Sequence, residues 1–395
     1  MNASHAFKSD YYRGMAPDST GPFYEFFCGA GMARLGLAGL FDCVFANDVS
    51  PQKAAAYAMA HGGEHLHVKN VWDLKTEELP GRAALAWASS PCQDLSLAGK
   101  RGGLAAPRSG AFFGFWRLVE ALDAEGRAPA VIVLENVSGL FTANRGGDVA
   151  QILFAMARLG YQVGALEIDA ALFTPQSRPR AFIVASRTSS LALCAEGPAS
   201  RFHSAKVMAA QALLPKAAQA AWRWWRLPEP PARNTALIDC LEDEAETPWR
   251  SPAQTEALLN LMSSAQRARL EALRAGGART VGAGFRRVRM ETGGKRQRLE
   301  VRFDGIAGCV RTPGGGSSRQ FVLMIDKGAV RIRLLTARES ARLMGLPDAF
   351  PLPAAETQAL QVIGDGVSAP VARWLGEHLL APLARASAVT GKAAA

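Results

Sequence analysis

The chain has 395 residues, of which 49% are hydrophobic and 20% are charged, a composition typical of globular proteins. This length predicts two or three domains, and no apolar run approaches the roughly 18 residues that a membrane-spanning helix needs. The net charge of +10 favours a polyanionic partner. The first residues, MNASHAFKSDYYRG, lack the apolar core of a secretory signal, so we expect a cytoplasmic protein with no membrane partner. Six cysteines without a CxxC pair indicate neither a disulfide framework nor a metal site.

Short apolar runs alternate with helix-like stretches in the first half of the chain. The runs FYEFF, CVFAN, LAWAS, VIVL and AFIVA predict strands, and the last three are continuously hydrophobic, as strands buried on both faces of a parallel sheet must be. The intervening stretches MARLGLAGL and QKAAAYAMA predict helices. The sequence therefore predicts an α/β, doubly wound core over residues 1–186.

The pattern changes over residues 187–329, which are rich in Trp, Arg, Pro and Gly and predict a second, smaller domain. Within it, the aromatic cluster at residues 222–226 is expected to form a small core and not to stack on bases. Helix signals resume after residue 330, where Thr336 and Glu339 have the spacing of a capping box. Residues 330–395 are predicted to return to the first domain.

Polar residues follow the predicted strands at their carboxyl ends, where open parallel sheets bind ligands. After the first strand, Gly29 and Gly31 permit a tight turn and a close approach of the backbone to a ligand. A nicotinamide dinucleotide fingerprint would need a glycine where Arg34 stands, which disfavours an oxidoreductase. Asp48, after the second strand, could bind ribose hydroxyls or cap the next helix, and the two readings are compatible.

Three further groups carry potential chemistry. Cys92 follows the third strand; a cysteine is more often a buried structural thiol, but in a polar setting a thiolate is a strong nucleophile. Glu135 ends the fourth strand and is either a satisfied structural carboxyl or a poised acid. Gln176, Arg178 and Arg180 share one face of an extended segment, which indicates a surface for an anion or a base edge.

Six motifs, in this order along the chain, resemble those of the DNA (cytosine-5) methyltransferase family. FFCGAGMARLGL resembles its cofactor-binding motif, SPCQDLS its nucleophile loop, ENV its Glu-Asn-Val strand end and QSRPR its Gln-x-Arg-x-Arg segment. RLLTARESARLMGLP and GDGVSAPV resemble its last two motifs. The resemblance implies a Rossmann-like methyltransferase sheet with a target-recognition domain at residues 187–329.

The resemblance also implies methylation of carbon 5 of cytosine with S-adenosylmethionine as the cofactor. Cys92 would attack carbon 6 of the base, Glu135 would protonate nitrogen 3, Arg180 would contact the exocyclic oxygen and Arg178 would brace the site. The residues expected at the cofactor are Phe27, Gly29, Ala30, Gly31, Met32, Asp48, Val49, Asn70, Val71, Ser90, Pro91, Asp365 and Gly366. Two of these depart from the family pattern, because Asn70 replaces an Asp and Asp365 replaces an Asn.

The partner implied by the resemblance is double-stranded DNA, with the target base flipped out of the stack. Residues 279–302 carry eight Lys and Arg against two Glu, a density that favours phosphate contacts. The residues expected at the DNA are Gln93, Ser96, Arg286, Arg287, Arg289, Arg319 and Gln320. Of these, Arg319 could contact guanine and Gln320 adenine.

We expect a bacterial, nucleoid-associated enzyme that acts as a monomer on DNA, with a cognate restriction endonuclease as a candidate partner. A catalytically quiet DNA-binding regulator of the same fold and an RNA cytosine-5 methyltransferase are the alternatives. His61, His65 and His67 superficially resemble a metal cluster, but no cysteine or carboxylate set completes one, and we expect them at the surface.

Overall fold

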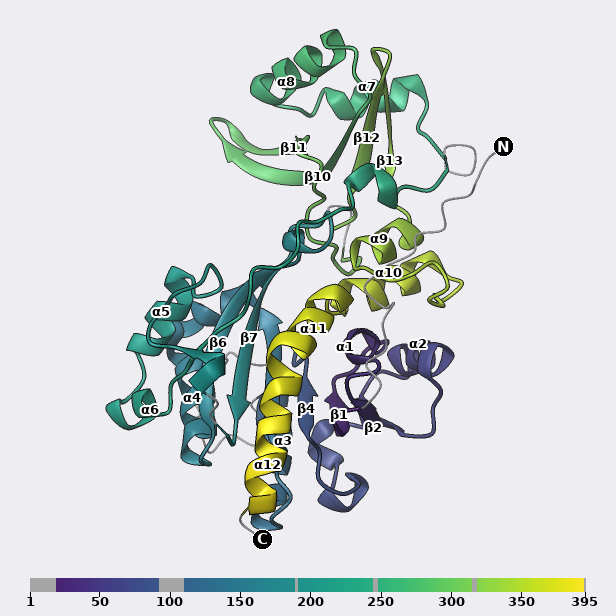
Figure 1. The fold of residues 1–395 in the computed structure, drawn as a ribbon. Helices are drawn as coiled ribbons and strands as arrows, with labels where there is room; N and C mark the ends of the chain where they lie inside the picture. Colours follow the sequence, from purple (N-terminus) through teal and green to yellow (C-terminus); the bar gives the residue numbers. More distant parts are fainter. Residues whose placement is uncertain (1–18, 92–109, 189–190, 244–247, 315–317, 394–395) are drawn as a thin grey trace. The chain divides into compact units, whose positions relative to one another are not determined.

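The computed structural model describes residues 19–91, 110–188, 191–243, 248–314 and 318–393. These residues form two compact units (Figure 1). The larger unit holds the described residues up to 169, then 179–230 and 367–393, and the smaller unit holds 170–178 and 231–366. In this grouping, residues 187–230 belong to the larger unit and 330–366 to the smaller one.

The larger unit is built on a seven-stranded sheet in the part of the chain that the structure describes. Its strands are β1 (Pro22–Phe26), β2 (Asp42–Asp48), β3 (Leu66–Val68), β4 (Leu85–Ala88), β5 (Val131–Val137), β6 (Gln162–Asp169) and β7 (Pro179–Ser186). They lie in the order β3-β2-β1-β4-β5-β7-β6. The first five are parallel, whereas β7 runs antiparallel to both of its neighbours. The predicted doubly wound α/β sheet is confirmed.

Helices cover this sheet and bury its apolar strands. All four residues of β4 and the first four of β5 are fully buried, as their continuous hydrophobicity predicts. The apolar faces of α3 (Ala111–Ala124) and α4 (Gly147–Arg158) share one large core cluster with strand residues. Helix α1 (Met32–Leu37) packs so closely on α11 (Ala369–Leu375) that a Cβ at Gly36 would lie 2.5 Å from the Ala369 oxygen. Only glycine permits this approach.

The remaining helices of the larger unit are α2 (Pro51–His61), α5 (Ala205–Ala212), α6 (Lys216–Ala220) and α12 (Ala381–Ala393), and its short strands are β8 (Cys194–Ala195) and β9 (Trp224–Trp225). Trp222 is 6% exposed and Trp225 is fully buried, and the Trp225 indole donates to the Val184 oxygen at 3.2 Å. The aromatic cluster is therefore a core element, as predicted. Its core, however, is that of the larger unit.

The smaller unit contains a four-stranded antiparallel sheet in the order β11-β10-β12-β13 within its described residues. Its elements are α7 (Pro252–Leu259), α8 (Ser264–Ala275), β10 (Thr280–Glu291), β11 (Gly294–Arg302), β12 (Phe321–Asp326), β13 (Ala329–Leu334), α9 (Ala337–Leu343) and α10 (Glu356–Asp365). Residues of α7, α8 and the sheet form its apolar core. Thr336 and Glu339 make the predicted capping box at the start of α9.

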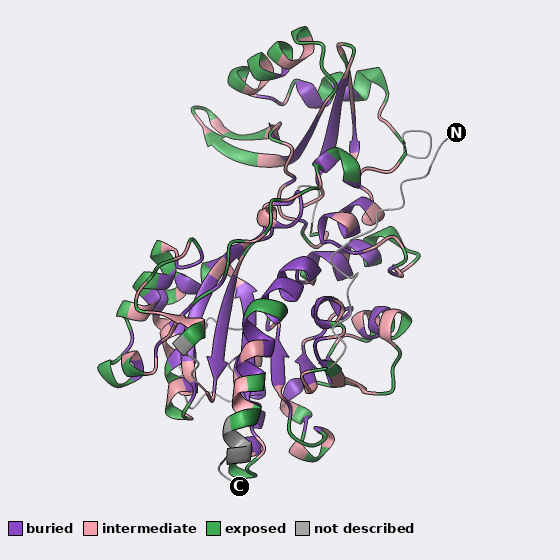
Figure 2. Ribbon diagram, in the orientation of Figure 1, coloured by how far each residue is buried: buried purple, intermediate pink, exposed green. Residues whose placement is uncertain are grey.

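Two features of the surface bear on partners. Strand β10 pairs with β12 only over Thr280–Gly284, so its outer part pairs with β11 alone and forms a two-stranded ribbon over residues 285–300. Figure 2 shows exposed residues along this ribbon. Among the described residues, none of the helices combines the length and the apolar character needed to cross a bilayer.

Candidate functional site

The loop after β1 adopts an unusual backbone conformation. Phe27, Gly29 and Gly31 all have positive φ values, of 56°, 56° and 73°. A positive φ is easy for glycine but strained for phenylalanine, so the surrounding structure must hold Phe27 in this conformation. The loop therefore turns sharply between β1 and α1, where Ala30 and Met32 are buried.

Asp48 fixes this loop to the end of β2. One of its carboxylate oxygens accepts from the Gly29 backbone N–H at 3.0 Å and the other from the Ser50 N–H at 2.8 Å. Ser50, and not Asp48, is the N-cap of α2, because its hydroxyl accepts from the Lys53 N–H and Pro51 takes the first helical position. Asp48 is therefore not the N-cap of α2. Its carboxylate instead links the loop after β1 to the loop after β2.

The two glycines of the loop differ in their surroundings. A Cβ on Gly29 would meet no atom of the described residues within 4 Å, whereas a Cβ on Gly31 would lie 2.5 Å from the His61 ring and 2.8 Å from the Tyr57 ring. His61 Nε2 also donates to the Gly31 oxygen at 3.0 Å. Gly29 therefore faces open space at the strand ends, and Gly31 packs against α2.

A buried polar network behind the loop was missed by the sequence reasoning. Glu25 in β1 is 1% exposed and accepts from the Arg34 backbone N–H at 3.2 Å. The Arg34 guanidinium donates to Tyr57 at 2.9 Å and also contacts His65. Burial raises the pKa of Glu25 to about 8. A glutamate in the middle of the apolar run FYEFF was the signal that could have revealed this network.

The three histidines expected at the surface are only partly exposed. His61, His65 and His67 are all half-buried. His67 stacks on Phe45 with 4.9 Å between ring centroids. Burial, with a further contribution from Arg34, lowers the pKa of His61 to about 4, so this ring is neutral near pH 7. These histidines pack against the loop after β1 and the edge of the sheet, where the short β3 pairs with β2.

The other expected cofactor residues lie at the ends of neighbouring strands or in the smaller unit. Val49, after β2, is 63% exposed. The exposed Asn70 caps the short helical turn Val71–Asp73 by accepting from the Trp72 N–H at 3.1 Å, and Val71 is buried. Asp365 and Gly366 lie at the end of α10 in the smaller unit, where Asp365 is exposed.

Glu135 and Arg180 come together at the junction of β5 and β7. The Arg180 Nε lies 3.3 Å from a Glu135 carboxylate oxygen, and their side chains are 14% and 8% exposed. Their strands pair antiparallel, with Arg180 opposite Val137, which brings the two side chains together. A carboxyl group beside a guanidinium in a nearly dry setting can hold and polarise a polar ring edge.

Asn136 links this strand end to the segment that precedes Cys92. Its side-chain amide donates to the Ser90 oxygen at 2.8 Å and contacts the Ser90 hydroxyl at 3.2 Å. Ser90 is buried, and Pro91 is the last described residue before a gap. Cys92, Gln93 and Ser96 lie outside the described residues. Ser90, two residues before Cys92, is thus held beside Asn136, the residue that follows Glu135.

Gln176 and Arg178 do not form a joint surface for an anion. Gln176 is fully buried; its amide donates to the Leu343 oxygen at 2.8 Å and accepts from the Val310 N–H at 2.9 Å. Arg178 is 2% exposed and donates to the oxygens of Gly364 at 2.9 Å and Gly366 at 2.6 Å. Burial turns both side chains into hydrogen-bonding partners of the backbone. Arg178 is therefore a positioning residue.

The ribbon carries fewer uncompensated charges than the sequence count indicates. Arg289 pairs with Glu300 at 2.5 Å, Arg298 with Glu291 at 2.6 Å, and Arg287 approaches Glu300 at 3.6 Å. The half-buried Arg286 lies 5.8 Å from the Phe321 ring centroid. The remaining cations near the tip, Lys295 and Arg296, are exposed and form no ion pair with a described residue.

Arg319 and Gln320 have partners within the protein. Arg319 donates to a Glu356 carboxylate oxygen at 2.7 Å. Gln320 is 5% exposed, and its amide both donates to the Gly308 oxygen and accepts from the Gly308 N–H, each at 2.8 Å. The base contact expected of Gln320 is therefore replaced by a structural role, because both of its hydrogen-bonding groups are used internally.

The chain matches a known protein family along most of its length. The profile of C-5 cytosine-specific DNA methylases matches residues 22–381. The chain belongs to this family. The methylase is 26% identical over 369 residues to the type II methyltransferase M.NlaX of Neisseria lactamica, covering 92% of this chain and 97% of that protein. It is 25% identical to M.HpaII of Haemophilus parainfluenzae, covering 91% and 89%.

Solved structures show the same fold for this methylase. The S. pombe Dnmt2 methyltransferase aligns with a TM-score of 0.55 and 18% identity, covering 90% of this chain and 96% of that one. The Entamoeba histolytica methyltransferase EhMeth aligns with a TM-score of 0.59 and 15% identity, covering 91% and 97%. At these identities the likeness concerns the fold alone.

Proposed function

We propose that this methylase transfers a methyl group to carbon 5 of cytosine within a specific duplex DNA sequence, through a transient bond between Cys92 and a flipped base. The hydrogen bond between Asn136 and Ser90 supports this proposal, because it holds the residues just before Cys92 beside the end of β5, where Glu135 lies. We further propose a bacterial modification enzyme, in keeping with the type II relatives, and we propose that it acts as a monomer.

The loop after β1 fits the proposed cofactor. Open space at Gly29 and the buried Asp48 carboxylate leave room for a ribose, and the exposed Val49 offers an apolar face to an adenine. Asn70 would accept from the adenine amine, and Val71 would support it. S-adenosylmethionine, when bound, supplies the methyl group. Within the smaller unit, Arg178 holds the backbone of Gly366.

The proposed chemistry needs a thiolate and an acid on the same ring. The Cys92 thiolate adds to carbon 6 of cytosine while Glu135 protonates nitrogen 3, which makes carbon 5 nucleophilic. After carbon 5 has taken the methyl group, loss of its proton expels the thiolate, and nitrogen 3 returns its proton to Glu135, which restores the neutral ring. Arg180 keeps the Glu135 carboxyl in place, and it would contact the exocyclic oxygen of the base. Buried and preorganised, these groups need little rearrangement during the reaction.

For the DNA contacts we propose the ribbon over residues 285–300. A two-stranded ribbon fits the major groove, and the exposed Lys295 and Arg296 near its tip can reach phosphates. Met290 and Val288 lie on one face and are 74% and 59% exposed, which suits contact with thymine methyl groups. Arg319 would first have to leave Glu356, so we assign it no base contact.

The direct test is incubation of the full chain with duplex DNA and a labelled methyl donor, followed by sequencing for 5-methylcytosine. We expect methylation within one short sequence. Methylation of tRNA in preference to duplex DNA would instead identify the RNA-modifying alternative, and no transfer to any nucleic acid would identify a quiet DNA-binding regulator.

The covalent step is tested with duplex DNA that carries 5-fluorocytosine at the mapped site. Fluorine cannot leave carbon 5 as the proton does, so the wild-type chain should remain bonded to the DNA. Cys92→Ala should form no adduct and should keep its cofactor affinity. Glu135→Gln should bind DNA normally and react far more slowly. A stable adduct in Cys92→Ala would contradict the proposed nucleophile.

A further inference from the structure

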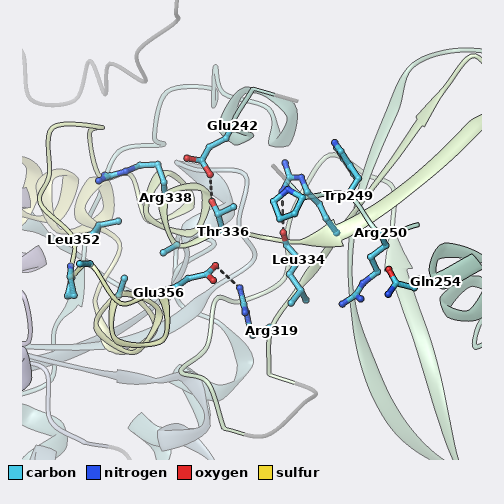
Figure 3. A pocket seen from close by; sticks show the side chains of 16 residues that line it. Glu242, Trp249, Arg250, Gln254, Arg319, Leu334, Thr336, Arg338, Leu352 and Glu356 are labelled. Atoms are coloured by element: carbon cyan, nitrogen blue, oxygen red, sulfur yellow. Dashed lines mark hydrogen bonds and ion pairs between the residues drawn. The ribbon is translucent and has the colours of Figure 1, made fainter. Parts of the chain in front are cut away.

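The smaller unit contains a cavity of about 730 Å³ in which both lining glutamates already have partners (Figure 3). Glu356 accepts from Arg319 at 2.7 Å, and a Glu242 oxygen accepts from the Thr336 hydroxyl at 2.5 Å. Because these groups serve each other, they do not select the chemistry of a ligand. The loop between β3 and β4 of the larger unit, in contrast, has a definite relation to the proposed cofactor site.

This loop, residues 69–84, begins with the two residues expected at the adenine of the cofactor, Asn70 and Val71. Asn70 is exposed, and its side-chain oxygen accepts from the Trp72 backbone N–H at 3.1 Å. Val71 is buried in the core of the larger unit. The Trp72 N–H therefore determines where the oxygen of the Asn70 carboxamide lies.

Helix α3 holds Trp72 at two further points. The Arg117 guanidinium donates to the Trp72 oxygen at 3.3 Å and to the Leu74 oxygen at 2.7 Å. The Trp72 indole packs over Gly114, where a Cβ would lie 3.1 Å from two of the ring atoms and 2.7 Å from a methyl group of Val71. Trp72 is thus held through its backbone N–H, its backbone oxygen and its ring.

Both α3 residues serve the loop more than they serve their own helix. Gly114 is buried in the middle of α3, where glycine is less favourable than alanine because it loses more backbone freedom on folding. The close approach of Val71 and Trp72 accounts for glycine at this position. Arg117 is exposed, yet its guanidinium is directed to two backbone oxygens of the loop.

We infer that Gly114 and Arg117 are positioning residues for the cofactor, which act through Trp72 to place the Asn70 carboxamide where it accepts from the adenine amine. This inference rests on the proposed function, which puts the adenine at Asn70. Accurate placement matters here because a carboxamide has one acceptor oxygen, whereas the carboxylate of an aspartate has two. The packing of α3 against the loop thereby contributes to selectivity for adenine over purines that lack the amine.

The test compares two ligands by calorimetric titration of the full-length protein. One is S-adenosylhomocysteine, the demethylated cofactor, and the other is its inosine counterpart, in which an oxygen replaces the adenine amine. The wild type should bind the adenine form about tenfold more tightly, since the inosine form leaves the Asn70 oxygen without its donor. Arg117→Gln and Gly114→Ala should each reduce this preference several-fold and leave the affinity for the inosine form nearly unchanged.

Arg127→Gln is the matched control. Arg127 ties the same loop through three backbone oxygens, those of Thr76, Leu79 and Gly81, at 2.6 to 2.9 Å. These residues follow Trp72 in the chain and have no hydrogen bond to Asn70 within the described structure. Arg127→Gln should therefore lower the melting temperature and keep the full preference for adenine. Melting temperatures also show which variants are folded, and either α3 variant suffices.

Asn70→Ala tests whether the effect passes through Asn70. This variant should lose the preference, and adding Arg117→Gln should then change it no further, because residues that act in series are not additive. Equal binding of both ligands by the wild type, or an undiminished preference in the folded Arg117 and Gly114 variants, would overturn the inference and leave the proposed methyl transfer intact. A wild type that binds neither ligand would overturn the proposed cofactor, and the inference with it.

Discussion

The two glycines of the loop after β1 make a matched pair of substitutions. Gly29 and Gly31 both have positive φ, so alanine at either position carries the same backbone penalty of about 1–2 kcal/mol. The added methyl group meets open space at Gly29 but lies 2.5 Å from His61 and 2.8 Å from Tyr57 at Gly31. Gly31→Ala should therefore destabilise the larger unit much more than Gly29→Ala.

The excess can be estimated from the contacts. Overpacking of a filled site costs about 1–3 kcal/mol, and displacement of His61 also breaks its hydrogen bond to the Gly31 oxygen, worth about 1 kcal/mol. Gly31→Ala should thus lose about 3–6 kcal/mol of the free energy of unfolding, against about 1–2 kcal/mol for Gly29→Ala. Gly29→Ala should nevertheless weaken binding of S-adenosylmethionine, because its methyl group occupies the proposed cofactor space.

Urea denaturation and calorimetric titration with the cofactor measure the two effects separately. Adding His61→Ala to Gly31→Ala should recover part of the lost stability, since it removes the nearest clashing ring. Equal destabilisation by the two alanines would refute the assigned packing of Gly31. Unchanged cofactor affinity in Gly29→Ala would refute the proposed placement of the cofactor.

Three further predictions concern buried polar groups. Burial raises the pKa of Glu25 from 4.5 to about 8, so the contribution of its protonated form to stability is complete below pH 4.5 and is lost as the pH rises through 8. Glu25→Gln should remove this loss of stability at high pH, which amounts to at most about 5 kcal/mol. Parallel pH profiles of the free energy of unfolding for the wild type and Glu25→Gln would contradict this. Arg333→Met should lose about 3–5 kcal/mol because it leaves the fully buried Glu339 without a counter-charge, and adding Glu339→Leu should recover only part of the loss in thermal unfolding, because leucine cannot accept from the Thr336 and Glu242 N–H groups. Asn136→Ala should lower kcat with little change in the DNA KM, because it removes the hydrogen bond that holds Ser90 and removes no contact with the substrate. An unaltered kcat would show that Asn136 does not position the segment before Cys92.

Many site residues were predictable because their evidence is local. Glycines after an apolar run indicate a turn that approaches a ligand, and Gly29 and Gly31 do adopt left-handed conformations. The capping box at Thr336 was predictable for the same reason, since it needs only a spacing of three residues. Such features depend on neighbours in the chain, which the sequence displays directly.

The sequence by itself determined five strands of the larger unit's sheet, because short apolar runs report burial within a sheet; their order in the sheet came only from the structure. The tertiary structure alone decided the use of each polar group. Gln176 and Gln320 resemble binding residues in the sequence, yet both are consumed by backbone partners more than ten positions away. Glu25 drew no attention, yet it is the buried centre of a network that depends on α1 and α2. Hydrogen-bond partners that are distant in sequence meet only after folding, so a side chain's availability to a ligand is a property of the fold.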